Sequence, residues 1–185
     1  MDIYLVRHST PDIPKGVCYG QADIDVTDSF DREVSRLKGI LPENSQCYSS
    51  PLKRCIKMAD YLSSDYQVDD RLMEMSFGEW EEKEWTTIDQ TALNEWMTNF
   101  VSSRVPNGES FNDLISRAID FWEELTETRA SGNYIVYTHG GFIRSIVTHL
   151  LSMPPEKVYS FHLDFASVTK VGIHNKQFRL EYLNR

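Results

Sequence analysis

The stretch that decides the fold of this chain is IYLVRHST, at residues 3–10. Residues 3–6 form a short apolar run typical of a buried strand, and Arg7 and His8 end it. A second stretch, YIVYTHGG at residues 134–141, repeats the pattern and places His139 after another apolar run. Open α/β sheets bind ligands at the carboxyl ends of their strands. We therefore expect these three side chains to meet at one sheet edge, where two imidazoles and a guanidinium suit a phosphate group.

Strand and helix patterns alternate along the chain. The pattern predicts helices at 31–41, 50–62, 111–125 and 142–151, and further strands at 46–49, 68–69, 168–173 and 178–183. The second helix is expected to begin with the Ser50 hydroxyl as its N-cap and Pro51 in its first turn. The aromatic, acidic stretch at about 71–110 has weak periodicity and is predicted to be a helical lid. This alternation favours an α/β fold with a mostly parallel sheet.

Composition restricts the class of protein. A chain of 185 residues is most simply one domain, here 1–185. A net charge of -9 argues against nucleic acid as a partner, and no apolar run is long enough to cross a membrane. The three cysteines at positions 18, 47 and 55 lack paired spacing, and the chain starts without a signal region, so we expect reduced thiols in a cytoplasmic protein.

Several residues could carry phosphate chemistry. A neutral His8 is a competent nucleophile, and the adjacent Arg7 would neutralise the phosphoryl oxygens that repel attack. Arg54 lies in the first turn of a predicted helix, where amide groups already favour an anion. His139 is followed by Gly140, which lets the backbone approach a ligand closely.

A leaving alkoxide needs an acid to protonate it. Glu74 lies among apolar and aromatic neighbours, which favour a protonated carboxyl, although four further glutamates at 79, 81, 82 and 84 are equally available from the chemistry alone. The sequence contains no recognisable metal-binding cluster and no glycine-rich nucleotide loop, so we expect neither a metal nor a cofactor. The remaining histidines, at 149, 162 and 174, are isolated and are expected to be packing or surface residues.

Five ordered blocks resemble the histidine phosphatase superfamily, in the branch that contains cofactor-dependent phosphoglycerate mutases. They are LVRH at 5–8, SSPLKR at 49–54, LMEMSFGEWE at 72–81, PNGES at 106–110 and THGG at 138–141. The resemblance implies a three-layer α/β/α sandwich and a metal-free phosphohistidine mechanism. It implies that His8 is the nucleophile, that Arg7, Arg54 and His139 bind the phosphoryl group, and that Glu74 is the proton donor.

Within the superfamily, the loop at 7–23 resembles that of the α-ribazole phosphatases, which remove phosphate from α-ribazole 5′-phosphate or cobalamin 5′-phosphate in cobalamin lower-ligand assembly. Ser9 stands where glycine is usual and the asparagine of the mutases is missing, which argues against a mutase. The residues expected to bind substrate are Ser9, Lys15, Tyr19, Gly20, Gln21 and Gly140.

The alternatives left open are a broad sugar or nucleotide phosphatase, a phosphohistidine protein phosphatase and a non-catalytic phosphate-binding module. An apolar patch near the closing hairpin is compatible with a homodimer.

Overall fold

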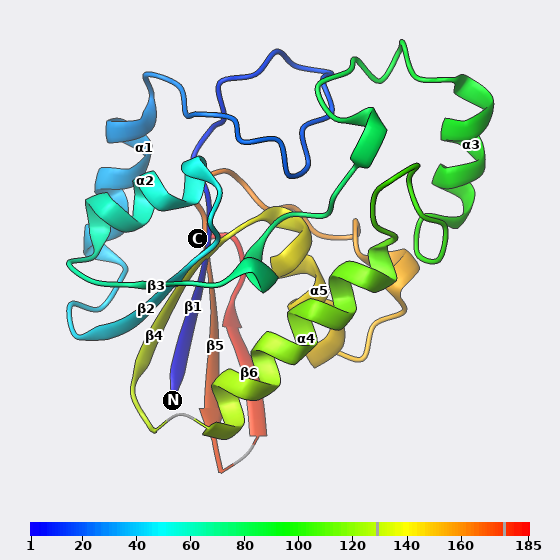
Figure 1. Cartoon of the computed structure of the whole chain (residues 1–185). Coiled ribbons are helices and arrows are strands. Elements are labelled where there is room, and N and C mark those ends of the chain that lie inside the picture. Colours follow the sequence, from blue (N-terminus) through cyan, green and yellow to red (C-terminus); the bar gives the residue numbers. More distant parts are fainter. Residues whose placement is uncertain (129, 176) are drawn as a thin grey trace.

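A computed structural model describes every residue of the chain except 129 and 176. Its centre is a six-stranded sheet with the order β3-β2-β4-β1-β5-β6 (Figure 1). The strands are β1 (Asp2–Arg7), β2 (Ser45–Ser49), β3 (Gln67–Val68), β4 (Asn133–Thr138), β5 (Val168–His174) and β6 (Gln177–Tyr182). The pairings among β3, β2, β4 and β1 are parallel, whereas those of β1 with β5 and of β5 with β6 are antiparallel.

The helices cover both faces of the sheet. They are α1 (Phe30–Ser35), α2 (Lys53–Leu62), α3 (Gln90–Asn99), α4 (Phe111–Thr128) and α5 (Gly140–Leu150), with short 3-10 turns η1 (Arg36–Gly39), η2 (Asp70–Leu72), η3 (Gly78–Trp80) and η4 (Pro155–Lys157). In Figure 1, α1 and α2 lie on one side of the strands and α4 and α5 on the other. The predicted layered α/β fold with a mostly parallel mixed sheet is confirmed.

Alternating residues of β1 pack into two separate hydrophobic cores, one on each face of the sheet. Ile3 and Leu5 of β1 pack with Trp122 of α4 and Phe142 of α5. Tyr4 and Val6 face the other way and join the core under α1 and α2. A strand exposes successive side chains on opposite faces, so a four-residue apolar run fills both layers. All of these β1 side chains are buried.

Two local predictions need correction. The helix expected over 31–41 is divided into α1 and η1. The expected N-cap at Ser50 is wrong, because α2 begins at Lys53 and Leu52, with an extended ψ of 136°, is its N-cap residue. Ser50 instead points its hydroxyl at His139. The turn expected at 174–177 includes Lys176, which lies outside the described residues.

The segment at 71–110 is mostly irregular, with η3 and α3 as its regular parts. Its aromatic residues form a third apolar cluster, together with the start of α4. In Figure 1 this segment and the loop that follows β1 lie over the carboxyl ends of the central strands. The described helices include none with the length and apolar character needed to cross a bilayer. The three cysteines are free and buried.

Candidate active site

The two predicted strand ends meet as expected. Arg7 at the end of β1 is in register with Thr138 at the end of β4, and the His8 amide donates to the Thr138 carbonyl oxygen over 3.0 Å. The His8 and His139 rings that follow have centroids 5.1 Å apart. Parallel pairing of adjacent strands therefore places two imidazoles side by side from segments far apart in sequence.

His8 is buried, with 1% of its surface exposed, and its two ring nitrogens differ. Nδ1 lies 2.7 Å from the Ser9 carbonyl oxygen, and because a carbonyl can only accept, Nδ1 must carry the proton. Nε2 therefore bears the lone pair, and it has no hydrogen-bond partner among the described residues. Burial, followed by the charges of Arg54 and Arg7, holds the pKa of His8 well below its usual value.

Two guanidinium groups lie around this imidazole. Arg54 is fully buried at the start of α2, and its terminal nitrogens donate to the carbonyl oxygens of Gly20 over 2.6 Å and Ala22 over 2.9 Å. Both partners are neutral, and no carboxylate of the described residues forms an ion pair with this guanidinium. Arg7 donates to the Leu163 carbonyl over 2.5 Å, and its guanidinium carbon lies 4.0 Å from the Phe165 ring centroid. A buried, unneutralised cation strongly favours an anionic ligand.

His139 completes the group from the start of α5. Its Nε2 lies 2.8 Å from the Ser50 hydroxyl and 3.4 Å from the Cys55 sulfur, whereas its Nδ1 has no partner among the described residues. Burial is the largest cause that holds the pKa of His139 well below its usual value, followed by the charge of Arg54. Both imidazoles are therefore neutral at pH 7.

At this site, four buried nitrogens remain unpartnered within the described part of the chain: Arg7 Nε, His8 Nε2, Arg54 Nε and His139 Nδ1. Buried polar atoms in native proteins nearly always find partners, so a group of four unsatisfied nitrogens indicates a ligand site. Three of them are donors and one is a lone pair. A tetrahedral phosphoryl group offers oxygens for the donors and an electrophilic phosphorus for the lone pair.

Glu74 lies against the beginning of α5. Its carboxylate accepts from the Gly141 amide at both oxygens over 3.1 Å and from the Met75 amide over 3.0 Å. It lines a cavity of about 220 Å³ together with Arg7 and Gly140. The carboxylate and the Arg7 guanidinium therefore line one cavity.

The model of the histidine phosphatase superfamily (branch 1) matches residues 3–185. The chain belongs to the histidine phosphatase superfamily. An Escherichia coli adenosylcobalamin/alpha-ribazole phosphatase is 26% identical over 194 residues, covering 100% of this chain and 96% of the relative. A Hydrogenobacter thermophilus protein provisionally named phosphoserine phosphatase 2 is 31% identical over 193 residues, covering 99% and 95%.

Solved structures agree with this membership. The crystal structure of the alpha-ribazole phosphatase from Shigella flexneri superposes with a TM-score of 0.90 at 25% identity, covering 100% of this chain and 96% of that one. The predicted resemblance to histidine phosphatases, including those named for α-ribazole, is confirmed.

In this histidine phosphatase, the loop after β1 supports the site. Gly20 has a φ of 35°, and its carbonyl accepts from Arg54. The Gln21 side chain donates to the Glu74 carbonyl oxygen over 2.9 Å, so it anchors the candidate acid. The Tyr19 ring lies 5.3 Å from the Arg54 guanidinium carbon and 6.5 Å from the His8 ring, and burial raises its pKa.

The other predicted substrate contacts lie in different surroundings. Ser9 is buried, and its hydroxyl has no partner among the described residues. A Cβ added to Gly140 would lie 3.3 Å from Arg7 Nε, so the glycine lets this guanidinium lie close to the backbone. Lys15 is exposed on the loop and is not among the residues that line the Glu74 cavity.

Sequence reasoning missed two arginines. Arg117 of α4 donates to the Glu74 carbonyl oxygen over 2.8 Å and pairs with Glu109 over 2.9 Å, so it fixes the backbone of the candidate acid. Arg144 of α5 lines the same cavity as Glu74 and donates to the carbonyl oxygens of Val158 and Phe161. Both lie inside helices without a motif around them, so no sequence signal marked either arginine as part of the site.

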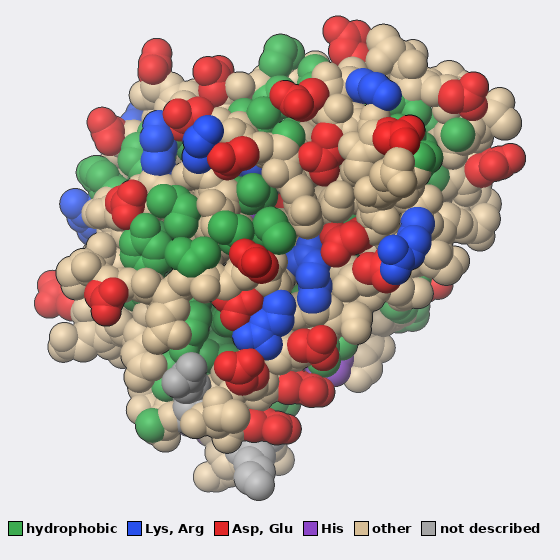
Figure 2. Space-filling view, viewed as in Figure 1, with side chains coloured by type: hydrophobic (Ala, Val, Ile, Leu, Met, Phe, Trp, Pro, Cys, Tyr) green, Lys and Arg blue, Asp and Glu red, His purple; other side chains and the backbone are tan. Residues whose placement is uncertain are grey.

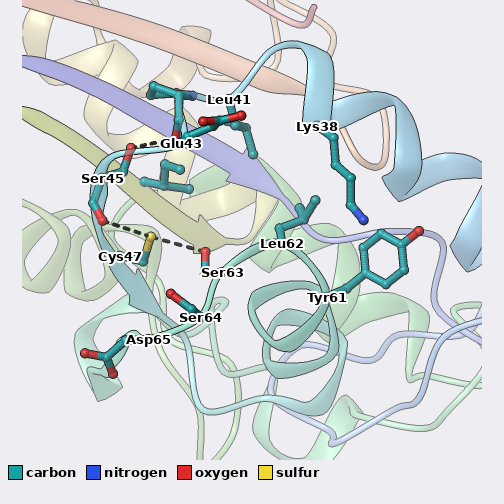
Figure 3. A pocket seen from close by; sticks show the side chains of 12 residues that line it. Lys38, Leu41, Glu43, Ser45, Cys47, Tyr61, Leu62, Ser63, Ser64 and Asp65 are labelled. Atoms are coloured by element: carbon teal, nitrogen blue, oxygen red, sulfur yellow. Dashed lines mark hydrogen bonds between the residues drawn. The ribbon is translucent and has the colours of Figure 1, made fainter.

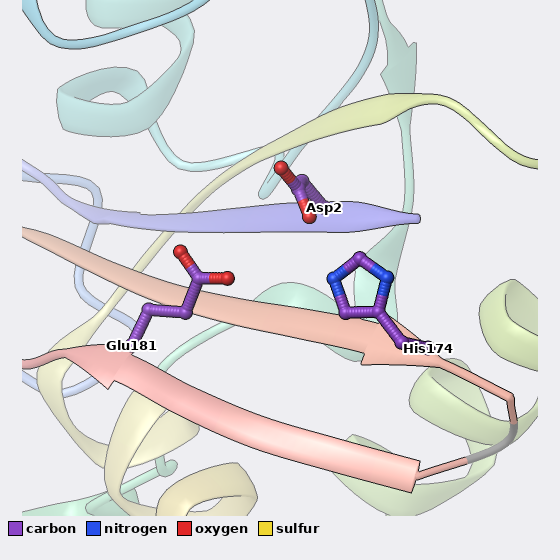
Figure 4. Close-up of side chains that lie close together, drawn as sticks. All are labelled: Asp2, His174 and Glu181. Carbon is purple, nitrogen blue, oxygen red and sulfur yellow. The ribbon is translucent and has the colours of Figure 1, made fainter.

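Two further clusters lie apart from this site. A cavity of about 460 Å³ between η1, the start of β2 and the end of α2 shares none of its lining residues with the group around His8 (Figure 3). Asp2, His174 and Glu181 approach one another across β1, β5 and β6 (Figure 4). Lys170 already pairs with both carboxylates, at 3.0 and 2.7 Å, which accounts for this cluster without an ion.

Acidic side chains are spread over the face seen in Figure 2, with basic side chains between them, as the net charge of -9 leads one to expect. The positive charge around His8 is therefore local and buried.

Proposed function

We propose that this histidine phosphatase is a phosphomonoesterase that forms a phosphohistidine at His8. The observation that carries the proposal is the group of four unpartnered buried nitrogens, in which three donors surround the lone pair of His8 Nε2. In this arrangement the donors of Arg7, Arg54 and His139 bind the phosphoryl oxygens, and His8 Nε2 faces the phosphorus. Ser9, Tyr19 and Gln21 belong to the loop that encloses the substrate.

The first step transfers the phosphoryl group to the enzyme. The lone pair of His8 Nε2 forms a bond to phosphorus while the bond from phosphorus to the ester oxygen breaks. The departing oxygen takes a proton from Glu74, which becomes a carboxylate. The Ser9 carbonyl oxygen retains its hydrogen bond to His8 Nδ1, so the ring keeps its orientation as positive charge develops.

The second step restores the enzyme. Glu74 takes a proton from a water molecule, whose oxygen forms a bond to phosphorus as the bond from phosphorus to Nε2 breaks. Inorganic phosphate leaves, and the electron pair returns to Nε2. The arginines balance the phosphoryl charge throughout, so we propose a reaction that needs neither a metal nor a cofactor.

Two substrates have support. The first candidate is α-ribazole 5′-phosphate, or the corresponding cobalamin 5′-phosphate in lower-ligand assembly. It is supported by the E. coli relative, by the Shigella flexneri structure and by the loop at 7–23. Phosphoserine is the second candidate, because the 31% identical Hydrogenobacter thermophilus relative carries that name. We propose α-ribazole 5′-phosphate as the substrate, with residues 71–110 acting as a lid over it in a single domain.

The test is phosphate release in excess EDTA from α-ribazole 5′-phosphate, phosphoserine, p-nitrophenyl phosphate, a sugar phosphate and a nucleoside monophosphate. We expect kcat/KM for the ribazole compound to exceed the others by at least about tenfold. We expect His8→Ala to abolish release, whereas His162→Ala, which removes an exposed ring, leaves it unchanged. Full activity of His8→Ala would contradict the mechanism, and equal rates on all five compounds would contradict the substrate.

A trapping experiment tests the intermediate itself. Glu74→Gln keeps the size of the side chain but supplies no proton to the leaving group and no base for water. With p-nitrophenyl phosphate, whose leaving group needs little protonation, this variant is expected to accumulate acid-labile phosphohistidine on His8. Absence of labelled protein in a rapid-quench experiment would argue that Glu74 does not serve the second step.

A further inference from the structure

An apolar pocket lies beside the phosphate site. It has a volume of about 470 Å³ and is lined by Phe77, Trp85, Leu93, Trp96, Met97, Phe100 and Tyr159. We call these seven residues the aromatic pocket. Five of them are aromatic, and none carries a formal charge. A cavity of this size lies within the roughly 300–1,000 Å³ typical of small-molecule sites.

The aromatic pocket adjoins the cavity that holds Glu74, and the two share part of their walls. Phe77 and Tyr159 line both the aromatic pocket and the cavity that holds Glu74 and Arg7. The Tyr159 ring also lies 5.4 Å from the guanidinium carbon of Arg144, another residue of that cavity. A substrate whose phosphate occupies the polar cavity would therefore extend its leaving group toward apolar surface.

Aromatic contacts hold the walls in place. Phe77 lies edge-to-face with Trp85 at 5.6 Å and with Trp96 at 5.8 Å, centroid to centroid. Phe100 lies 6.2 Å from Trp96 and makes a tilted contact with Tyr159 at 5.6 Å. Edge-to-face and tilted geometries are the favoured arrangements of aromatic pairs, so these rings stabilise one another as walls of the pocket.

We infer that the aromatic pocket binds a flat, uncharged aromatic base carried by the leaving group of the phosphomonoester. This inference rests on the proposed function and specifies its substrate class. Of the two supported substrates, α-ribazole 5′-phosphate has such a base, a benzimidazole with few polar edge atoms. Phosphoserine presents an ammonium and a carboxylate, and desolvating either group against these walls would cost free energy without return.

The apolar walls add to this selection. A benzimidazole base brings one acceptor nitrogen, whereas adenine or cytosine would bring several polar edge groups that the walls leave unpaired. The pocket therefore favours a benzimidazole over the bases of ordinary nucleotides.

The test compares two substrates that share the same leaving oxygen. Ribose 5-phosphate and α-ribazole 5′-phosphate both release a 5′-hydroxyl, and they differ in the base. We expect the native protein to prefer the base-bearing compound by at least about tenfold in kcat/KM. Met97→Gln places an amide at the pocket rim without adding charge, and Met97 is 60% exposed, so folding is preserved. This variant should lose about fivefold for the ribazole compound and change ribose 5-phosphate less than about twofold.

Controls separate this inference from the chemistry. Asn94→Gln alters an exposed side chain of the same helix α3 outside the pocket, and it should change neither rate. Equal loss on both substrates in Met97→Gln, or equal rates on both in the native protein, would overturn the inference while the phosphohistidine mechanism stood. Persistent turnover in His8→Ala would overturn the mechanism instead.

A binding measurement covers the case of slow turnover. Calorimetry on His8→Ala compares the affinities of the two compounds without hydrolysis. Tighter binding of α-ribazole 5′-phosphate, weakened by a further Trp96→Leu change, supports the pocket; equal affinities would overturn it.

Discussion

A histidine ring has two nitrogens, and the partner of one decides what the other can do. The Ser9 carbonyl oxygen occupies Nδ1 of His8, so the lone pair lies on Nε2. The Ser50 hydroxyl, 2.8 Å from Nε2 of His139, can donate to it and leave a proton on Nδ1. The neighbouring rings thus differ in tautomer: His8 presents a lone pair at Nε2, and His139 presents a proton at Nδ1.

The lowered pKa values make a prediction for stability. A histidine held neutral in the folded protein binds protons more readily when unfolded, so the unfolded state takes up more protons below pH about 6.5. The free energy of unfolding should therefore fall as pH drops below that value, by at most about 1.4 kcal/mol per pH unit for each of His8 and His139. Urea unfolding between pH about 5 and 7 measures the slope.

The matching variant is His139→Gln, which should flatten this slope, while His162→Gln, at an exposed ring, should leave it as it is. An unchanged slope in His139→Gln would show that this ring is not held neutral.

Ser50 yields a second prediction at this scale. Ser50→Ala removes the donor that selects the His139 tautomer, and the lost hydrogen bond of about 1–1.5 kcal/mol corresponds to about a tenfold fall in kcat/KM. Ser45→Ala, which removes a hydroxyl bonded to the Pro42 carbonyl away from the site, is the control. Wild-type kinetics in Ser50→Ala would show that the Cys55 contact alone orients the ring.

At the scale of single residues, strand ends and motifs were enough to predict Arg7, His8, Arg54, Glu74 and His139, which the structure brings together around one site. The tautomers of the two histidines could not be predicted, because they depend on which ring nitrogen meets the Ser9 carbonyl or the Ser50 hydroxyl in three dimensions. Ser50 is an example: its position in the sequence predicted a helix N-cap, whereas in the structure its hydroxyl is a hydrogen-bond partner of His139.

Helix α5 couples the two halves of the candidate chemistry. His139 precedes it, and its first turn donates the Gly141 amide to Glu74. A Cβ on Gly141 would overlap Glu74 Oε1 and lie 2.8 Å from Leu114 Cδ2. The glycine is therefore required by the position of a carboxylate on another segment.

Gly141→Ala should displace Glu74 and lower kcat by at least about tenfold, since a misplacement of about 1 Å can cost a hundredfold. Phosphate binding, measured by calorimetry, should change far less because the arginines are untouched. Gly39→Ala is the control, since a Cβ there would meet nothing within 4 Å. Normal kcat in Gly141→Ala would mean that Glu74 is not the acid.

At the scale of elements, the periodic segments were predicted well and the segment at 71–110 was not. Helices α4 and α5 and the strands follow from clear apolar spacing. The segment at 71–110 owes its shape to contacts among Phe77, Trp80, Trp85 and Trp96, which are irregularly spaced in the sequence. Because these contacts follow no helical or strand period, they could not be predicted from apolar spacing.

At the scale of the molecule, the candidate active site lies at one end of the sheet and a charged cluster lies apart from it. In this cluster Lys170 lies between Asp2 and Glu181. Its hydrogen bond to Glu181 raises the pKa of the lysine. Only 16% of that lysine side chain is exposed, so the pairs are partly shielded from water.

Lys170→Met should lower the free energy of unfolding by about 1–2 kcal/mol, because two carboxylates lose a common cation, and should leave kcat/KM unchanged. Lys57→Met, which removes an exposed pair with Asp25, should cost less than about 1 kcal/mol. Urea unfolding and phosphate release measure the two properties; a fall in kcat/KM for Lys170→Met would contradict the separation of the cluster from the site.

The insertion of β4 between β2 and β1 ties the assembly of the site to the completion of the sheet. Position 139 lies more than a hundred residues after position 8, so the two imidazoles meet only when β4 has paired with β1. Strand β5 pairs with the other side of β1, and Arg7 bonds to Leu163 in the segment that precedes β5. A chain whose sheet is incomplete therefore lacks a complete site.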